Sequence, residues 1–237
     1  MTAEIAGDTA LQSVVLEDLV EARRYRRWLV DLALPHLGED PLEVGSGLGH
    51  YAADWAEAGV PLWTASEADE ERLAALRTRF EDDPVVRVRV LTVPIDEQAH
   101  HTAVVAYNVL EHIPDDVEAL RTFAALLRPG GRVVLVVPAF PSAMSRFDRE
   151  IGHQRRYRRR TLRAVAESAG LTVEVLHHVN SIGLLAWFLH VKAMRSRPRA
   201  GFTLTVFDRF FVPWLRRLEA RVPPPFGQSL FLVARKD

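Results

Sequence analysis

The chain of 237 residues is 48% hydrophobic and 26% charged, and its formal net charge is -1. These values fit one globular domain with a sizeable core and argue against a general nucleic-acid-binding protein, which carries excess positive charge. The absence of cysteine excludes disulfides and thiolate metal sites and favours a reducing compartment, for which the cytoplasm is the default. The longest uncharged apolar run, from Ser181, is much shorter than the ~20 residues that span a bilayer, so no spanning segment is expected.

Helix and strand patterns alternate along most of the chain. Apolar residues at helical spacing over residues 11–37 predict a first helix that ends before Gly38. The predicted strands then cover residues 41–45, 60–67, 84–93, 102–109, 132–140, 171–179 and 228–236. The predicted helices between them cover residues 51–59, 69–80, 114–127 and 159–170. Because helix-length connections join parallel strands, the sequence predicts an α/β fold with a mostly parallel sheet and helices on both faces.

An apolar insertion interrupts this alternation over residues 180–226, before the last predicted strand. It contains two helical patterns and a concentration of large aromatic side chains. We expect it to form a cap over one edge of the sheet that accepts an apolar, lipid-like small molecule, with Trp187 and Phe211 in contact with that molecule. The alternatives are an ordinary extra helical layer, a dimer face, or a surface that docks on a membrane with the help of the basic turn RSRPR.

The stretch EVGSGLGHYA, residues 43–52, places glycine at three alternate positions after the first strand. Glycines here let the backbone approach a ligand at the carboxyl edge of the sheet, although a tight turn is the alternative. His50 stands where a dinucleotide-binding loop needs its last glycine, which disfavours a pyrophosphate. Glu43 is a carboxylate inside an apolar strand, and Glu67 ends the second strand, where it can accept both hydroxyls of a ribose. Together these features indicate a ligand with a ribose, an amino acid portion and a positive charge.

Four segments in order resemble the class I S-adenosylmethionine-dependent methyltransferases: LEVGSGLGHYA, the acid in SEAD, YNVLEHIPDD and LLRPGGRVVLVVPAF. The resemblance covers about Arg24 to Asn180. The segments DREIGHQRRYRRRTL and FGQSLFLVARK are in addition similar to those of a bacterial small-molecule subgroup of these enzymes, and that resemblance runs from RYRRWL to the C-terminus. It implies a Rossmann-like, seven-stranded sheet whose last strand is antiparallel, and S-adenosylmethionine as the cofactor. The residues that it implies for cofactor binding are Glu43, Gly45, Ser46, Gly47, Gly49, Glu67, Ala68, Thr92 and Asn108. At Thr92, many relatives have instead an aspartate that holds the adenine.

Methyl transfer from a sulfonium is an in-line displacement, so the protein chiefly aligns the reactants and sometimes removes a proton from the acceptor. His112, after the fourth strand, and His153 and Tyr157, after the fifth, are the candidates for this base. A packing role is the alternative for His112. Arg155 and Arg156 are candidates for binding an anionic acceptor, against the alternative of a solvated helix start.

A metal site is not expected. The placement of Asn108, Glu111 and His112 is similar to that of the metal-binding carboxylates and histidine of ubiquinone-biosynthesis O-methyltransferases. However, an amide stands at position 108, where a carboxylate would be needed, and two good ligands do not make a site.

The sequence therefore predicts one methyltransferase domain over residues 1–237, with a helical lid over residues 1–38 and the helical cap over residues 180–226. Tyr25, in the lid, is expected to contact the bound ligand or to pack in the core. We expect methylation of a small, hydrophobic acceptor by a monomer or homodimer, and we favour oxygen as the methylated atom because candidate bases are plentiful. The alternatives are RNA methylation and a protein that binds S-adenosylmethionine without transferring its methyl group.

Overall fold

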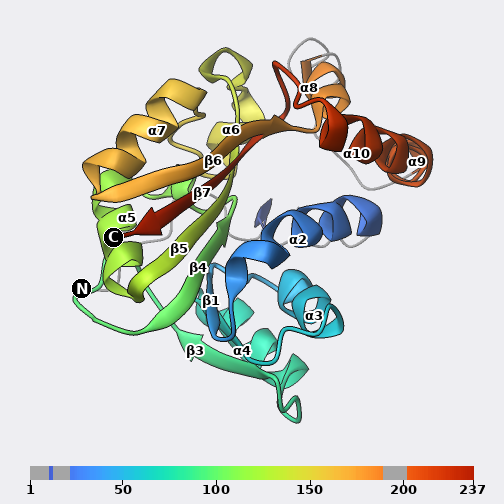
Figure 1. The fold of residues 1–237 in the computed structure, drawn as a ribbon. Helices are drawn as coiled ribbons and strands as arrows, with labels where there is room; N and C mark the ends of the chain where they lie inside the picture. Colours follow the sequence, from blue (N-terminus) through green and yellow to red (C-terminus); the bar gives the residue numbers. More distant parts are fainter. Residues whose placement is uncertain (1–10, 13–21, 189–201) are drawn as a thin grey trace.

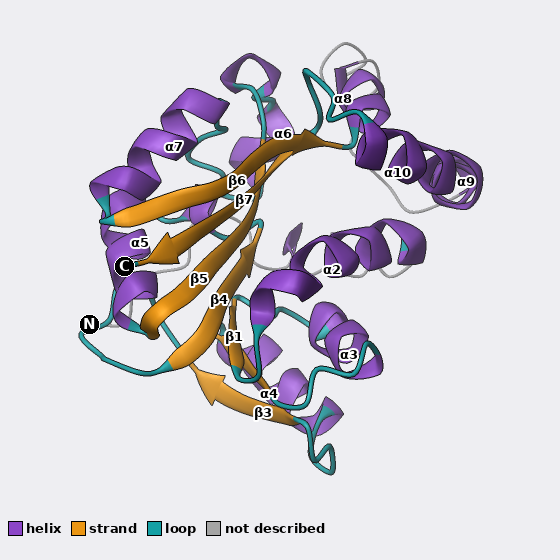
Figure 2. Cartoon of the chain, viewed as in Figure 1, coloured by secondary structure: helices purple, strands orange, loops and turns teal. Residues whose placement is uncertain are grey.

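The computed structural model describes residues 11–12, 22–188 and 202–237. They form a seven-stranded sheet of order β3-β2-β1-β4-β5-β7-β6 (Figures 1 and 2). The strands are β1 (Pro41–Val44), β2 (Trp63–Glu67), β3 (Val86–Val90), β4 (His101–Tyr107), β5 (Leu127–Pro138), β6 (Leu171–Val179) and β7 (Ser229–Lys236). The first five are parallel, whereas β7 pairs antiparallel with both β5 and β6. The predicted fold, including its antiparallel last strand, is confirmed.

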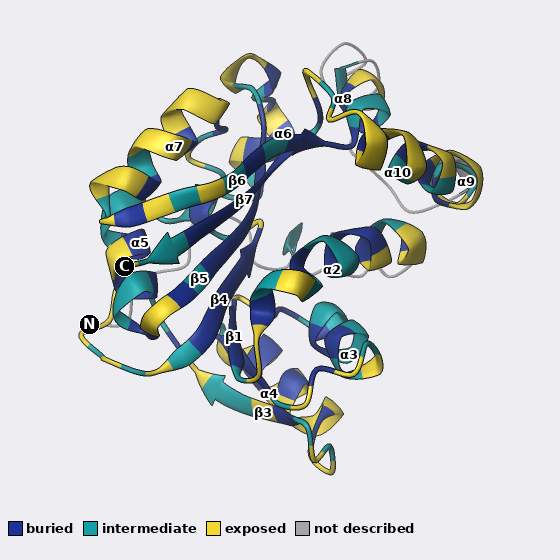
Figure 3. Cartoon of the chain, viewed as in Figure 1, coloured by how far each residue is buried: buried dark blue, intermediate teal, exposed yellow. Residues whose placement is uncertain are grey.

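Helices cover both faces of the sheet. On one face, α2 (Arg23–Leu37), α3 (His50–Glu57) and α4 (Glu70–Arg79) pack on the sheet, and on the other face α5 (Asp116–Ala125) and α7 (Arg159–Ser168) do so. The central strands are nearly continuous apolar runs because both of their faces are covered, and Figure 3 shows them as the most buried part of the chain.

Two differences from the predicted elements matter for the site. The segment RPGG, residues 128–131, lies inside β5 and does not form a separate turn. The pairing of β4 with β5 is irregular there, and this irregularity accommodates Gly130 with its φ of 74°. Three short helices were not predicted: η2 (Leu110–His112), η3 (Pro141–Ala143) and α6 (Arg146–Glu150). They follow β4 and β5 at the carboxyl edge of the parallel strands.

The insertion is helical, as predicted, and lies where β6 ends and β7 begins (Figure 1). It comprises α8 (Ser181–Trp187), α9 (Phe202–Val206), η5 (Phe207–Phe211) and α10 (Val212–Arg221); the rest of the predicted helix after α8, residues 189–194, lies outside the described residues. The buried carboxylate of Asp208 accepts hydrogen bonds from the backbone N–H groups of Arg24 (3.0 Å) and Tyr25 (2.9 Å), which fixes the start of α2 against the insertion.

The other side of η5 and α10 carries exposed apolar side chains. Phe210, Phe211, Trp214 and Leu218 each expose between 45% and 65% of their surface. This face is the feature on which the dimer and membrane-docking alternatives for the insertion rest. Within the part of the chain that the structure describes, no helix is long and apolar enough to cross a membrane.

Candidate functional site

The glycine loop between β1 and α3 has a left-handed backbone at each of its three glycines. Gly45, Gly47 and Gly49 have φ angles of 72°, 55° and 75°, which strain any other residue. A Cβ on Gly45 would lie 2.7 Å from Val109 Cγ2, and one on Gly49 would lie 2.6 Å from the ring of Phe80. Two of the glycines are therefore required by the protein's own packing, in addition to any contact with a ligand.

Glu67 joins this loop to the turn after β2. It is the last residue of β2, as predicted, and its buried carboxylate accepts hydrogen bonds from the N–H groups of Gly47 (2.8 Å), Ala68 (2.9 Å) and Asp69 (3.1 Å). The guanidinium of Arg72 lies 3.5 Å away. A ribose hydroxyl at Glu67 would share the carboxylate with these donors.

Glu43 is also buried and also hydrogen-bonded. The Ser46 hydroxyl donates to it over 2.9 Å and the Trp63 indole N–H over 3.3 Å. Burial raises the pKa of Glu43 to about 7, and these two hydrogen bonds offset only part of the effect. Two further residues predicted to bind the cofactor lie at the ends of neighbouring strands: Thr92 is half-buried after β3, and Asn108 is exposed after β4 with a φ of 54°.

The structure brings three titratable side chains together at the same sheet edge. Glu111 and His112 belong to η2, and His153 follows α6. Glu111 is completely buried, and neither of its carboxylate oxygens has a hydrogen-bond partner among the described residues. His153 Nε2 lies 3.7 Å from Glu111 Oε1, and the His112 and His153 rings meet edge-on with centroids 4.7 Å apart. We call Glu111, His112 and His153 the trio.

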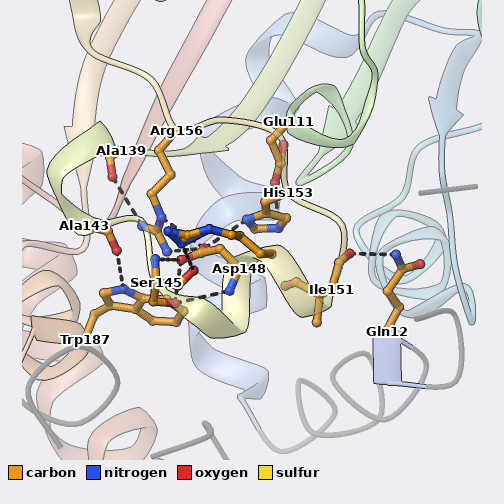
Figure 4. A network of polar contacts seen from close by, with 11 residues as sticks. Gln12, Glu111, Ala139, Ala143, Ser145, Asp148, Ile151, His153, Arg156 and Trp187 are labelled. Carbon is orange, nitrogen blue, oxygen red and sulfur yellow. Dashed lines mark hydrogen bonds and ion pairs between the residues drawn. The ribbon is translucent and has the colours of Figure 1, made fainter. Parts of the chain in front are cut away.

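Asp148, on α6, fixes the orientation of His153. Its buried carboxylate accepts from the Ser145 hydroxyl (2.7 Å), from Arg156 Nη2 (2.7 Å) and from His153 Nδ1 (3.0 Å), as Figure 4 shows. Burial alone would raise the pKa of Asp148, but the hydrogen bond from His153 and the charge and hydrogen bonds of Arg156 outweigh it and hold the pKa well below its usual range. The ring of His153 is thereby oriented with Nδ1 toward Asp148 and Nε2 toward Glu111.

The two other members of the trio have strongly shifted pKa values. Burial raises the pKa of Glu111 to about 7, and the charge of His153 offsets part of this. Burial, and then the charges of His153 and Arg72, lower the pKa of His112 to about 3. His112 is therefore neutral near pH 7, and its Nδ1 is buried without a hydrogen-bond partner among the described residues.

Tyr157, Arg155 and Arg156 have partners inside the protein. The Tyr157 hydroxyl donates to Asp116 over 2.9 Å, and burial raises its pKa far above the usual value. Arg155 donates to the carbonyl oxygens of Ile113 (2.7 Å) and Pro114, and Arg156 donates to Asp148. These contacts give the three side chains a role in holding the loops together; contact with an acceptor stays a prediction for each of them.

The aromatic candidates divide between two places. Trp187 lies beside the Asp148 network: its indole N–H donates to the Ala143 carbonyl over 3.1 Å, and the Arg156 guanidinium lies 4.5 Å from its ring centroid. Phe211 is half-exposed and stacks on Phe207 within the insertion.

Tyr25, on α2, packs edge-on against the buried ring of Trp28. Burial raises the pKa of Tyr25 to about 12, and hydrogen bonds with Ser229 and Asn180 offset part of this shift. These contacts support the core-packing alternative for Tyr25, and contact with a ligand stays a prediction.

Sequence reasoning missed Asp148, Ser145 and Gln12. The first two form a capping box at the start of α6, and the spacing S-x-x-D was a signal for it in the sequence. The side chain of Gln12 donates to the Ile151 carbonyl (2.7 Å) and accepts from Arg72 (3.3 Å). Gln12 thus connects the trio's side of the edge with the glycine loop's side, which no local pattern indicated.

Comparisons with known proteins agree on one family. A family model described as a methyltransferase domain matches residues 20–176. A ubiquinone biosynthesis O-methyltransferase from Bordetella avium is 33% identical over 111 residues, which are 45% of this chain and 45% of that protein. One from Nitrosospira multiformis is 35% identical over 99 residues, 40% of this chain and 41% of that protein. The matched segment thus spans less than half the length of these curated relatives.

Solved structures share the fold at low sequence identity. A geranyl diphosphate methyltransferase in complex with S-adenosylmethionine has a TM-score of 0.59 at 18% identity and covers 88% of this chain and 84% of its own. Phosphoethanolamine N-methyltransferase 2 of Haemonchus contortus has a TM-score of 0.58 at 17% identity, and the match covers 85% of this chain and 49% of that protein's chain. At these identities the likeness concerns the fold alone.

Proposed function

The chain belongs to the class I S-adenosylmethionine-dependent methyltransferases, and from that membership we propose that it methylates an oxygen atom of a small, hydrophobic acceptor. The observation that carries the proposal is the trio, which presents unshared lone pairs at the edge of the sheet where the glycine loop also lies. A hydroxyl is the acceptor that needs such groups, because it must lose a proton as the methyl group arrives.

The cofactor occupies the glycine-loop side in this proposal. Gly45, Ser46, Gly47 and Gly49 contact its amino acid portion, with Glu43 beneath them, and Glu67 accepts the ribose hydroxyls, with Ala68 next to it. Thr92 and Asn108, after the neighbouring strands, flank the adenine. Support comes from the geometry of the turn: Gly47 and Ala68 donate to opposite oxygens of the Glu67 carboxylate, so the glycine loop and the turn after β2 are held in one orientation.

The acceptor lies on the other side, next to the trio. Trp187, Phe147 and Ile151 form an apolar cluster there with Leu11, which suits a hydrophobic molecule. Of the two histidines, His153 is the better candidate for taking the proton. Asp148 holds its ring and leaves Nε2 free, whereas His112 has a pKa of about 3 and is a weak base. Tyr157 donates its own proton to Asp116, and its neutral hydroxyl oxygen is a much weaker base than an imidazole nitrogen.

The test is turnover of S-adenosylmethionine with a labelled methyl group. A panel of phenols and apolar alcohols is compared with matched amines, and with total RNA as a further arm. We expect label in an organic-extractable ether product from at least one hydroxyl compound. Label that enters only the amines or the RNA would refute the proposal, as would cofactor binding without transfer to any acceptor.

A further inference from the structure

The insertion gathers most of the exposed apolar side chains of this protein. Of the nine large hydrophobic side chains that are exposed among the described residues, seven belong to residues 181–226. The two exceptions, Val90 and Ile95, lie on and after β3, at the opposite edge of the sheet. Apolar side chains that are gathered in one place on a surface mark an interaction site.

Two stripes of side chains run along η5 and α10. One stripe is buried against the rest of the chain and consists of Asp208, Val212, Leu215 and Glu219. The other stripe is exposed and consists of Phe211, Trp214, Leu218 and Val222. Within each stripe the residues are three or four positions apart, so they share one side of the helix. Figure 1 shows α9 and α10 at the periphery of the molecule, and Figure 3 shows exposed residues along them. The insertion therefore presents a convex apolar ridge.

The two carboxylates of the insertion point away from this ridge. Asp208 accepts hydrogen bonds from the backbone at the start of α2. Glu219 accepts from the backbone N–H groups of Asn180 (3.0 Å) and Ser181 (2.9 Å) at the start of α8. Both carboxylates are buried, so neither contributes negative charge to the exposed face.

The exposed charged side chains of the insertion, among its described residues, are all arginines: Arg209, Arg217 and Arg221. Within the described part of the chain none of the three has an ion-pair partner, whereas the half-buried Arg216 pairs with Asp31 over 2.8 Å. The basic turn RSRPR, named with the membrane-docking alternative, lies outside the described residues. An apolar ridge bordered by unpaired arginines complements a surface that is negative outside and apolar beneath.

We propose that η5 and α10 dock on the surface of an anionic lipid bilayer. Phe211, Trp214 and Leu218 enter the boundary between headgroups and acyl chains, and the arginines contact the lipid phosphates. The inference goes beyond the proposed function and is independent of it, because lipid binding is measured without acceptor or cofactor.

The charge and the shape of the ridge favour a bilayer over a protein partner. In a two-fold interface between copies of this chain the same patch meets itself, so the arginines would face one another without an acid to pair with. A rigid protein partner needs a groove that matches the ridge, whereas a bilayer surface adapts to it.

The experiment measures flotation of the tag-free full chain with vesicles of phosphatidylcholine alone and with about one third phosphatidylglycerol. We expect binding to the anionic vesicles to be at least about tenfold tighter and to weaken as salt is added, because each arginine near the surface contributes about fivefold. Brominated phosphatidylcholine gives a second readout, since bromine quenches the tryptophans that it contacts. Trp214 is the only exposed tryptophan among the described residues, so its fluorescence should be quenched.

Two variants separate the apolar contribution from the electrostatic one. Trp214→Ala should weaken binding to the anionic vesicles by at least about tenfold, because a large aromatic side chain no longer enters the bilayer. The double variant R217Q/R221Q should weaken it by about 30-fold and leave the weaker binding to neutral vesicles unchanged.

The matched controls come from the opposite edge of the sheet. Val90→Ala removes an exposed apolar side chain of β3, and R77Q/R87Q removes two exposed arginines of α4 and β3. We expect both to bind the vesicles as the wild type does. If W214A fails to fold by circular dichroism, F210A takes its place.

Three results would overturn the proposal. The first is a wild type that binds neither kind of vesicle or binds both equally well. The second is W214A and R217Q/R221Q that bind as tightly as the two controls. The third is a dimer in analytical ultracentrifugation that W214A dissociates, because a second copy of the chain then covers the ridge.

Discussion

Glu43 and Glu111 are two buried glutamates near the same edge of the sheet, and burial raises the pKa of each to about 7. Their surroundings differ. Glu43 accepts hydrogen bonds from Ser46 and Trp63, whereas Glu111 has no hydrogen-bond partner among the described residues. The glycine-loop side of the site is thus completed by the protein itself, and the trio's side is not. A buried polar group that the fold leaves unpaired indicates where a ligand is needed.

The two sides are nevertheless physically connected. Arg72 lies 3.5 Å from Glu67 on the glycine-loop side and donates to Gln12, whose amide donates to the carbonyl of Ile151 at the end of α6. Gln12 belongs to the segment predicted as an N-terminal lid. Its contacts place Gln12 between the two sides of the site, and the lid role of the segment stays a prediction.

The largest expected effect concerns the incomplete side. His153→Gln should lower turnover by roughly 10²- to 10⁴-fold with nearly unchanged affinity for S-adenosylmethionine, because it removes the imidazole that we propose takes the proton of the acceptor. Single-turnover kinetics and calorimetry provide the two measurements. The control is H178Q, because His178 is also a buried histidine but stacks on Phe140 outside the trio. Wild-type turnover in H153Q would mean that alignment of the reactants alone accounts for the transfer.

The next prediction tests the completed side. Gly47→Val should weaken S-adenosylmethionine binding by more than about 100-fold, since a branched side chain is strained at a φ of 55° and would displace the loop that Glu67 holds. Gly59→Val is the matched control, because Gly59 has a φ of 84° with nothing within 4 Å of an added Cβ. If both variants bind the cofactor equally well, the loop does not contact it.

The completed side was also the side that the sequence predicted best. The glycines, Glu43 and Glu67 lie within 25 residues, and their positions in the first strand, in the loop after it and at the end of the second strand follow from local sequence patterns. The trio could not be predicted in the same way, because its geometry depends on contacts between segments far apart in the chain. Asp148 fixes His153 only after α6 has folded, and residues 108–112 by themselves gave no reason to include His153.

A smaller effect concerns the pH dependence of the free energy of unfolding, which Glu43 should change. Because the pKa of Glu43 is about 7 in the folded chain and near 4.5 in the unfolded one, the folded chain holds the proton more tightly. The wild type should therefore lose about 2 kcal/mol of stability relative to Glu43→Gln as the pH rises from 5 to 8. Urea denaturation of the cofactor-free proteins at several pH values measures this difference. Parallel stability curves would show that Glu43 is ionised throughout.

The smallest effect should separate two aromatic residues of the insertion. Trp187→Ala should raise the KM for the acceptor by about tenfold, because the indole packs on Arg156 and donates to Ala143 beside the trio and so lies next to the proposed acceptor. Phe211→Ala should change this KM by less than about twofold, since Phe211 is half-exposed and stacks on Phe207. Both variants should keep wild-type affinity for S-adenosylmethionine, because neither residue belongs to the glycine-loop side.

The reverse order of the two KM effects would place the acceptor on the exposed face of η5 and α10. In that case the trio would lose the neighbouring acceptor on which its proposed role as proton acceptor rests.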